Sequence, residues 1–320
     1  MQIKTILVHR LFKNKNRINY KLNSAEEISE YHFTFTGEFG YEVLVWIPYL
    51  NFLSHTLNIK FHIICKKGLE DLYENLAASI SFLERRNIGD GFGDIKKQQF
   101  KNKKIFTINE QCIALNKNIE VAGIPFLNKD IHKTINQKFY RIPIIPIQNL
   151  ETIHRIVDEK IVVINNKQHF NWNGELRNFY TADELAKIFN LLTLKGYKII
   201  YNDPNRLVYD PSSVNTNQSD SAKIDKLISR NKNITDLNAL DNEDILLRNR
   251  LQFILWDKAE FIIGVHGGSV YIPAFLGKKQ YIVFKSGNYF DFIELARITS
   301  TKINCHYEVE NLLLDLENNE

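Results

Sequence analysis

Cysteine is scarce in this 320-residue sequence, and its three residues, Cys65, Cys112 and Cys305, lie far apart. None of them belongs to a Cys-x-x-Cys motif or has the spacing of a zinc site. A sparse and odd set of thiols is typical of a reducing compartment, where each cysteine fills a small space in the core. The sequence therefore predicts neither a disulfide framework nor a zinc centre.

Long apolar runs are missing as well. The N-terminal stretch MQIKTILVHRLFKNK has only residues 6–8 as an apolar run, which is too short for a signal peptide. No segment approaches the ~18 apolar residues of a membrane span. The net charge of +4 is mildly basic and does not indicate a nucleic-acid partner. We therefore expect a cytoplasmic protein with at most peripheral membrane contact.

Apolar residues make up 44% of the chain and aromatic residues 12%, which is enough for a substantial core. Strands and helices alternate in two trains, separated by the proline-punctuated linker 141–154, and such alternation predicts parallel sheets. The first train has strands at 31–36 and 59–66 and helices at 41–58 and 68–83. The second has strands at 160–166, 197–203, 261–265 and 279–285, helices at 181–196, 243–260 and 269–277, and a final strand and helix within 303–319.

The predicted fold class is therefore α/β, with two Rossmann-like domains facing a cleft. Residues 1–150 would form the N-terminal domain. Residues 151–320 would form the C-terminal domain, whose terminal helix is free to pack back on the N-terminal one.

Two local signals refine the second half. Thr181 is predicted to cap a helix through a capping box with Glu184, and Gly196 to end that helix. The polar stretch 204–233 has no hydrophobic periodicity. A stretch of that length predicts a mobile loop or lid.

The sequence GVHGGS follows the buried strand 261–265, at the strand end where open α/β sheets bind ligands. Gly267 and Gly268 would let a ligand approach the backbone and would permit positive φ. Ser269 would cap the next helix and leave N–H groups free for an anion. His266 would donate to a phosphate, more strongly when protonated. The set fits a pyrophosphate-containing ligand, although a plain tight turn around a core histidine is an equal alternative.

Familiar motifs do not account for this turn. Gly264, Gly267 and Gly268 lack the spacing of the dinucleotide motif G-x-G-x-x-G, and no Gly-Lys-Ser/Thr follows as in a Walker A loop. HGGS is similar to the oxyanion loop of esterases, but the chain has no G-x-S-x-G nucleophile elbow. A serine hydrolase is therefore disfavoured.

Gly264, His266, Gly267 and Gly268, followed by IPAFLGK, resemble the G-x-HGA/G motif of a family of GT-B-type glycosyltransferases. That family includes plant cell-wall xylosyltransferases and O-linked N-acetylglucosaminyltransferases. The resemblance covers about 161–285 and departs from the family pattern at Gly268, where alanine is common, and at the Ser-Val pair that follows. It implies a nucleotide-diphosphate sugar bound at this turn and leaves the sugar open.

The resemblance also implies a basic residue after the first strand of the same domain. Lys167 lies in that loop and Arg177 further along it, and a lysine would stabilise a leaving diphosphate without a metal. Asn165 would hydrogen-bond phosphate or ribose, and Asp291 or Glu294 would accept from a ribose. Each of these residues could instead be an ordinary loop residue.

A second glycine-containing turn, GEFGYE, follows the first strand and is similar to the G-E-x-G-[WY]-E signature of several bacterial and viral glycosyltransferase-like sequences. Gly37, Gly40 and Tyr41 would lie on the acceptor side. Transfer needs a group that takes the proton of the acceptor hydroxyl. Glu38 is the first candidate for this base and Glu42 the second. Either glutamate could instead favour the helix N-terminus electrostatically.

The hypothesis from sequence is a metal-independent glycosyltransferase, assumed to invert, that moves a sugar from a nucleotide-diphosphate donor to a hydroxyl of a glycan or other acceptor. The Asp-x-Asp motif through which GT-A-type transferases bind a metal does not occur, and no cofactor is expected. The alternative is a non-catalytic nucleotide-sugar or glycan-binding protein on the same scaffold. The oligomeric state is left open.

Overall fold

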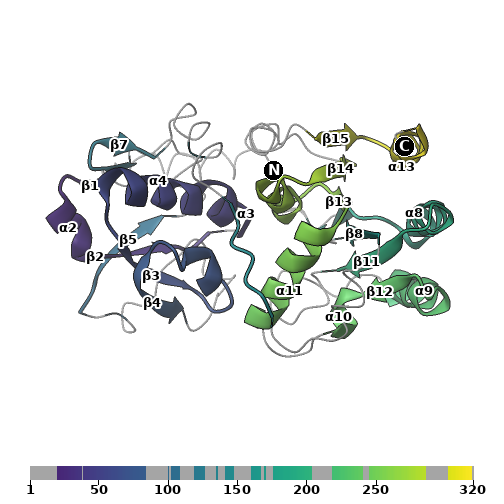
Figure 1. Ribbon diagram of the computed structural model, residues 1–320, viewed down its shortest axis with the longest axis horizontal. Coiled ribbons are helices and arrows are strands. Elements are labelled where there is room, and N and C mark those ends of the chain that lie inside the picture. Colours follow the sequence, from purple (N-terminus) through teal and green to yellow (C-terminus); the bar gives the residue numbers. More distant parts are fainter. Residues whose placement is uncertain are drawn as a thin grey trace, which may run out of the picture.

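Two α/β lobes lie side by side in the computed structural model (Figure 1). Parallel sheets form the centre of both lobes, so the predicted class, α/β with two Rossmann-like halves, is confirmed. The predicted boundary after residue 150 falls outside the described residues. The structure describes residues 20–37, 39–83, 100, 102–108, 119–126, 135, 141–147, 160–166, 169–170, 176–203, 218–240, 245–285 and 302–318.

The N-terminal lobe is built on a parallel sheet in the order β4-β3-β2-β5. Phe33 and Phe35 of β2 are fully buried and contact Trp46, because alternate side chains of a strand share one face. The strands are β2 (Tyr31–Phe35), β3 (Phe61–Lys66), β4 (Ala77–Leu83) and β5 (Lys104–Ile108).

After β2 the chain forms one nearly continuous helical stretch that covers this sheet. It consists of α3 (Phe39–Tyr41), the π-helical segment η1 (Glu42–Trp46) and α4 (Ile47–Leu57). Pro48 is the second residue of α4, so the change from π-helix to α-helix falls where proline has no N–H to donate. The predicted helix at 41–58 is therefore present, with a π-helical first turn.

Shorter elements complete the N-terminal lobe. Helix α2 (Ala25–Ser29) contacts β2 and β3. A small sheet at the lobe's edge joins β1 (Tyr20–Leu22), β6 (Ile119–Val121) and β7 (Ile124–Pro125).

The C-terminal lobe has a six-stranded parallel sheet in the order β12-β11-β8-β13-β14-β15. Every residue of β8 and β13 is buried, which is typical of parallel strands covered on both faces. The strands are β8 (Ile161–Asn165), β11 (Lys198–Asn202), β12 (Ile234–Asp236), β13 (Phe261–Val265), β14 (Lys279–Val283) and β15 (Ile303–His306).

Helices cover both faces of this sheet (Figure 1). On the side of the N-terminal lobe lies α11 (Ile245–Lys258), together with η4 (Gly268–Leu276), a 3-10 helix that contacts α11. On the outer side lie α8 (Ala182–Leu194), α9 (Gln218–Arg230) and α13 (Val309–Asn318). The predicted capping box is confirmed, because Thr181 Oγ1 accepts from Glu184 N and Glu184 Oε2 accepts from Thr181 N.

Three expectations from sequence need correction. The predicted helix at 68–83 is instead a 3-10 turn, η2 (Glu70–Tyr73), followed by the strand β4. The stretch expected to be a loop or lid contains α9, which is anchored by the buried Ile224. The terminal helix packs within its own lobe, since α13 contacts α8, β14 and β15.

The two lobes meet along a seam that is partly apolar. Helix η4 contacts α3 and η1 of the N-terminal lobe, and one buried apolar cluster includes Val43 of η1 together with Val270 of η4. At another point of the seam, the guanidinium of Arg250 on α11 forms two hydrogen bonds to the carboxylate of Asp71 in η2. Beside it, Asn249 Nδ2 donates to Gly68 O at 2.7 Å.

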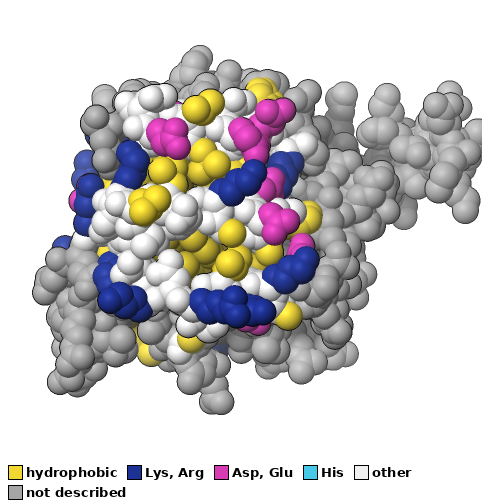
Figure 2. Space-filling model, turned by 90° about the vertical axis from the view of Figure 1, so that its right-hand side faces the viewer, with side chains coloured by type: hydrophobic (Ala, Val, Ile, Leu, Met, Phe, Trp, Pro, Cys, Tyr) yellow, Lys and Arg dark blue, Asp and Glu magenta, His cyan; other side chains and the backbone are white. Residues whose placement is uncertain are grey.

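The outer face of the C-terminal lobe, formed by α8, α9 and α13, mixes basic, acidic and apolar side chains (Figure 2). Leu194 on α8 is 78% exposed and Leu314 on α13 is 56% exposed. Because both charge signs are interspersed there, this face has the character of an ordinary solvated surface. Within the described part of the chain, no helix combines the length and the apolar character that a bilayer crossing requires.

Candidate functional site

The turn after β13 is fixed by close packing at its start. A Cβ atom added to Gly264 would lie 2.2 Å from Val270 Cγ2, so only glycine lets η4 pack so closely against the strand. The amide of Gln280, when oriented to suit its neighbours, donates to Val270 O and accepts from Ala274 N. Gly264 therefore serves the packing of η4, whereas the sequence placed it among the donor-binding residues.

His266 lies at the base of this turn and is 8% exposed. Its Nδ1 is 2.6 Å from Tyr271 Oη, and its ring stacks on Phe284 with centroids 4.5 Å apart. Burial lowers the pKa of His266 to about 4, so the imidazole is neutral at pH 7. His266 can therefore act as a neutral hydrogen-bond donor, and the stronger donation expected of a protonated ring is not available at pH 7.

The helix after the turn begins one residue earlier than the sequence predicted. Gly267 is its N-cap and Gly268 its first residue, so Ser269 lies inside the first turn and is not the cap. Gly267 has φ 171° and ψ 160°, an extended conformation open to any residue, so positive φ is not its purpose. A Cβ at Gly267 would meet nothing within 4 Å. The backbone therefore borders open space at this point, which is where a ligand would approach.

Polar side chains from neighbouring strands lie beside the turn at the carboxyl edge of the sheet. Asn165 pairs in register with Gly264 on one side and with Asn202 on the other. Asn202 Nδ2 donates to Asn165 Oδ1 at 2.8 Å and to Gln252 Oε1 at 3.0 Å. Asn165 Nδ2 and Asn202 Oδ1 are buried and have no hydrogen-bond partner within the described ranges. Asn165 is thus placed beside the turn with one amide donor unused, as a ligand-binding residue would be.

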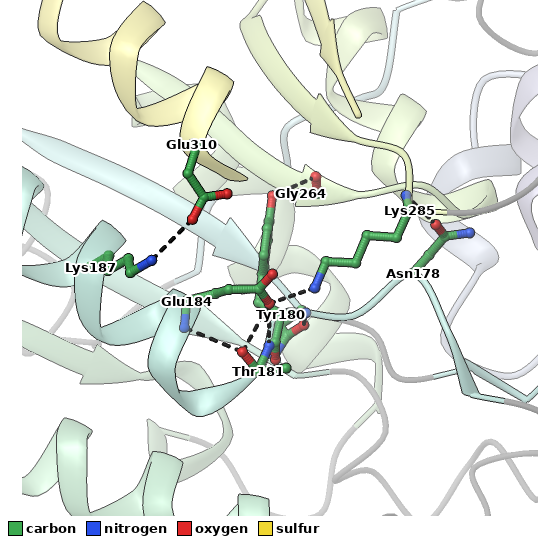
Figure 3. A network of polar contacts seen from close by, with 9 residues as sticks. Asn178, Tyr180, Thr181, Glu184, Lys187, Gly264, Lys285 and Glu310 are labelled. Atoms are coloured by element: carbon green, nitrogen blue, oxygen red, sulfur yellow. Dashed lines mark hydrogen bonds and ion pairs between the residues drawn. The ribbon is translucent and has the colours of Figure 1, made fainter. Parts of the chain in front are cut away.

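The loop before α8 is held onto the same edge. Asn166 Oδ1 accepts from Tyr180 N at 2.7 Å, and Tyr180 Oη donates to Gly264 O at 2.9 Å (Figure 3). Burial raises the pKa of Tyr180, which keeps its hydroxyl protonated as a donor. The end of β8, the start of α8 and the end of β13 therefore form one connected structure.

A lysine that the sequence reasoning missed, Lys285, follows β14 at this edge. The backbone N–H of Lys285 donates to Asn178 Oδ1 at 2.9 Å, and the ammonium of Lys285 donates to Glu184 Oε2 (Figure 3). The ammonium also lies over the ring of Tyr180, 6.0 Å from the centroid. Its side chain is 26% exposed, so this cation is accessible from solvent beside the turn.

The turn after β2 is anchored by charged groups. Glu42 is fully buried, and its Oε1 accepts from Tyr73 Oη at 2.7 Å while its Oε2 lies 3.2 Å from Lys66 Nζ. Lys66 Nζ also donates to Gly37 O at 2.9 Å. A carboxylate so enclosed has no open path to an acceptor hydroxyl. This geometry favours a structural role for Glu42 over the role of base.

The two turns lie close to each other across the seam between the lobes. Gly40 and Tyr41 belong to α3, which contacts η4 directly. Gly40 is buried and Tyr41 half-buried. The acceptor-side turn and the glycine turn of the donor side therefore come together, although they are more than 220 residues apart in the chain.

Several predicted site residues cannot be placed. Arg177 is the last residue of β10 (Leu176–Arg177), which pairs with β9 (His169–Phe170), and its side chain is not among those described. Glu38, Lys167, Asp291 and Glu294 lie outside the described residues, and their roles stay predictions.

The residues that sequence reasoning missed are Asn178, Tyr180, Asn202, Tyr271, Phe284 and Lys285. One signal was available for Lys285, since it is the last residue of the strand predicted after the glycine turn, and ligands bind at the carboxyl ends of such strands. Within the described ranges, no three His, Cys, Asp or Glu side chains gather as a metal-ligand set.

No protein-family model and no curated protein matches this chain. Solved structures do match. The E. coli heptosyltransferase WaaC with ADP is 12% identical, with TM-score 0.50 over 91% of this chain and 100% of that one. The E. coli ADP-heptose lipopolysaccharide heptosyltransferase II is 10% identical, with TM-score 0.52 over 90% and 97%. A family 9 glycosyltransferase from Veillonella parvula DSM 2008 is 10% identical, with TM-score 0.52 over 91% and 92%.

Likeness at these low identities shows the fold, and that fold is GT-B. The GT-B part of the resemblance stated from sequence is thereby confirmed. Its narrower part, the likeness to xylosyltransferases and O-linked N-acetylglucosaminyltransferases, is not supported by these neighbours.

Proposed function

We propose that this chain is a glycosyltransferase that moves a sugar from a nucleotide-diphosphate donor to a hydroxyl of an acceptor. The contact between α3 and η4 carries the proposal. It brings an acidic glycine turn of one lobe against a turn of the other lobe whose backbone borders open space at Gly267. Fold likeness to structures described as heptosyltransferases agrees with this proposal.

The donor diphosphate would lie at the first residues of η4, where helix N–H groups point toward an anion. Because burial favours the neutral form of His266, we assign the charge balance of the leaving group mainly to other residues. Lys285 is a partly exposed cation at the same edge of the sheet, paired with Glu184, and Lys167 is predicted to lie in the loop after β8. Together with the N–H groups of η4, these lysines would stabilise the diphosphate as its bond to the sugar breaks.

In the proposed reaction the acceptor oxygen attacks the anomeric carbon, and the bond from that carbon to the diphosphate oxygen breaks. The acceptor proton goes to a carboxylate, for which Glu38 remains the candidate. The nucleoside diphosphate leaves with the bonding electron pair. Inversion at the anomeric carbon, independence of metals and a glycan as acceptor are parts of the same proposal.

A nucleotide panel tests the donor assignment. Purified protein is mixed with ADP, UDP or GDP in EDTA, and its thermal unfolding is followed. ADP is tested first, because WaaC was solved with it. We expect at least one diphosphate to raise the melting temperature, since a ligand that binds only the folded state stabilises it. Absence of a shift with all three would refute the donor site.

Turnover separates the enzyme from its main rival. The corresponding nucleotide sugars are incubated with the protein in EDTA, and release of the nucleoside diphosphate is measured. Release supports a metal-independent transferase. Tight nucleotide binding without release, with or without Mg²⁺ and with candidate acceptors, would favour a non-catalytic nucleotide-sugar-binding protein.

Two matched lysine variants test the donor cation. Lys285 and Lys187 each form an ion pair next to α8, with Glu184 and Glu310 respectively (Figure 3), but only Lys285 lies at the carboxyl edge of the sheet. We expect Lys285→Ala to raise the Kd of the bound diphosphate about tenfold, roughly 1.4 kcal/mol. Lys187→Ala should leave it unchanged. Equal Kd values for the two variants would remove Lys285 from the site.

A further inference from the structure

A buried charged cluster lies under the turn of the N-terminal lobe. Glu42, 0% exposed, receives a hydrogen bond from Tyr73 Oη on one oxygen and the ammonium of Lys66 on the other. Lys66 and Tyr73 belong to other elements, β3 and η2. Three separate segments of the chain thus converge on one carboxylate.

The cluster holds the turn at both of its ends. Lys66 Nζ bonds the carbonyl oxygen of Gly37 at 2.9 Å and the carboxylate of Glu42 at 3.2 Å. Residues 38–41 lie between these two attachment points in the sequence. A single ammonium therefore fixes the entry and the exit of the acidic turn.

Stability alone does not explain such a cluster. Moving two charges out of water costs about as much as their attraction returns, and well-packed apolar residues of equal volume often serve as well or better. The carboxylate of Glu42 is fully buried and the side chain of Lys66 is only 17% exposed. A buried ion pair gives the groups that it joins a defined position, which apolar packing does not.

The same turn is where the lobes meet. Glu42 begins η1, a π-helical segment, and such segments frequently occur at functional sites. Both η1 and the preceding α3 contact η4. The position of the acidic turn relative to the glycine turn of the other lobe therefore depends on how Glu42 and Lys66 hold it.

We propose that Glu42 and Lys66 are positioning residues, which set the acidic turn in the place that transfer requires. The inference rests on the proposed function and reassigns Glu42 from candidate base to support for the turn. Displacing reacting groups by about 1 Å can lower a rate by roughly 100-fold. Loss of the cluster should thus act on kcat, while the donor site in the other lobe stays intact.

The test uses a charge-neutral double variant, Glu42→Gln with Lys66→Met, which keeps side-chain volume and leaves no buried charge unpaired. We expect kcat to fall at least ~10-fold, with the KM of the nucleotide sugar within about twofold of wild type. The single variant Lys66→Arg keeps the positive charge and should therefore retain most of the wild-type kcat. Lys104→Met is the control, because it removes an exposed ion pair with Glu30 in the same lobe; it should change neither parameter.

Hydrogen exchange gives a readout independent of turnover. In the double variant, amides of the peptide 35–41 should exchange faster than in wild type, while peptides of β13 and β14 stay unchanged. Wild-type kcat with wild-type exchange at 35–41 would overturn the inference, as would equal losses in kcat and donor affinity. If wild-type protein transfers no sugar, the proposed function fails, and the exchange experiment still decides whether the cluster holds the turn.

Discussion

The two turns that face each other across the seam have the same outline but opposite chemistry. Each follows a buried parallel strand and leads into a helix. The turn after β2 is held by an ionised pair, Glu42 and Lys66, whereas the turn after β13 is held by neutral aromatic contacts of His266 with Tyr271 and Phe284. This difference would be expected if a doubly charged ligand binds only at the second turn. The residues that hold that turn would then not need to carry a charge of their own.

The largest loss of stability is expected when only one partner of the Glu42–Lys66 ion pair is removed. Lys66→Met leaves the carboxylate of Glu42 buried without its cation, and we expect the free energy of unfolding to fall by about 3–5 kcal/mol. Urea denaturation measures it. The double variant with Glu42→Gln should recover most of the loss. A loss below about 1 kcal/mol in the single variant would mean that the pair is not truly buried.

The neutral turn should be most sensitive at Gly264. Gly264→Ala places a methyl group against Val270, and overpacking of this kind costs about 1–3 kcal/mol. Thermal denaturation reports it, and adding Val270→Ala should relieve it in part.

Gly267→Ala is the matched control for Gly264→Ala, because its methyl group meets no atom within 4 Å. We expect its stability to stay within about 0.5 kcal/mol of wild type, while its affinity for the nucleoside diphosphate falls. Unchanged affinity would show that the open space at Gly267 is not the ligand's approach.

For the aromatic side chains that hold His266, we expect a smaller loss of stability than for Lys66→Met. Tyr271→Phe removes the hydroxyl that lies 2.6 Å from His266 Nδ1, and the loss of such a buried hydrogen bond costs about 1–2 kcal/mol. Urea denaturation of this variant beside Lys66→Met compares the two supports directly. If Tyr271→Phe were the more damaging of the two, the contrast between a charged and a neutral support would be wrong.

The last prediction concerns pH. The pKa of His266 is about 4 in the folded protein, below the ~6.5 of an unfolded chain. The unfolded state therefore binds the proton first, and the stability linked to His266 is lost as pH falls from about 6.5 toward 4. His266→Gln should flatten this part of the stability profile measured by urea denaturation. Parallel profiles for the variant and wild type would show that folding does not lower the pKa of His266.

The sequence predicted the elements whose signals are local. The capping box at Thr181 and Glu184 is complete within four residues, and the buried strands β8 and β13 are unbroken apolar runs flanked by turns. The glycine turns were recognised for the same reason, since a strand, glycines and a helix follow one another directly. This was enough to predict the α/β class and its two halves.

Features that depend on distant partners were missed. The segment 77–83 resembles a helix in composition but forms β4 by pairing with β3, so tertiary context overrides propensity. Helix α9 lies in a polar stretch whose apolar stripe is short: Ile224, Leu227 and Ile228 are the residues that pack on the core. Its i, i+3, i+4 spacing was present in the sequence and was masked by the surrounding polar residues.

The candidate site was predicted only in part, because some of its residues are neighbours in the chain and others are brought together by the sheet. Gly264, His266 and Gly267 were found because they are neighbours in the chain. Asn202 and Lys285 were not, because only the parallel register of the sheet brings the end of β14 beside that of β13, and the end of β11 beside that of β8. Burial also bears on the role expected of His266, since it makes the imidazole neutral.

Helix η4 contacts both lobes. Its first residues border the space where an anion would sit, and its body is wedged against α3 and η1 of the other lobe. A ligand bound at the first residues of η4 would therefore lie on the same nine-residue helix that contacts the other lobe.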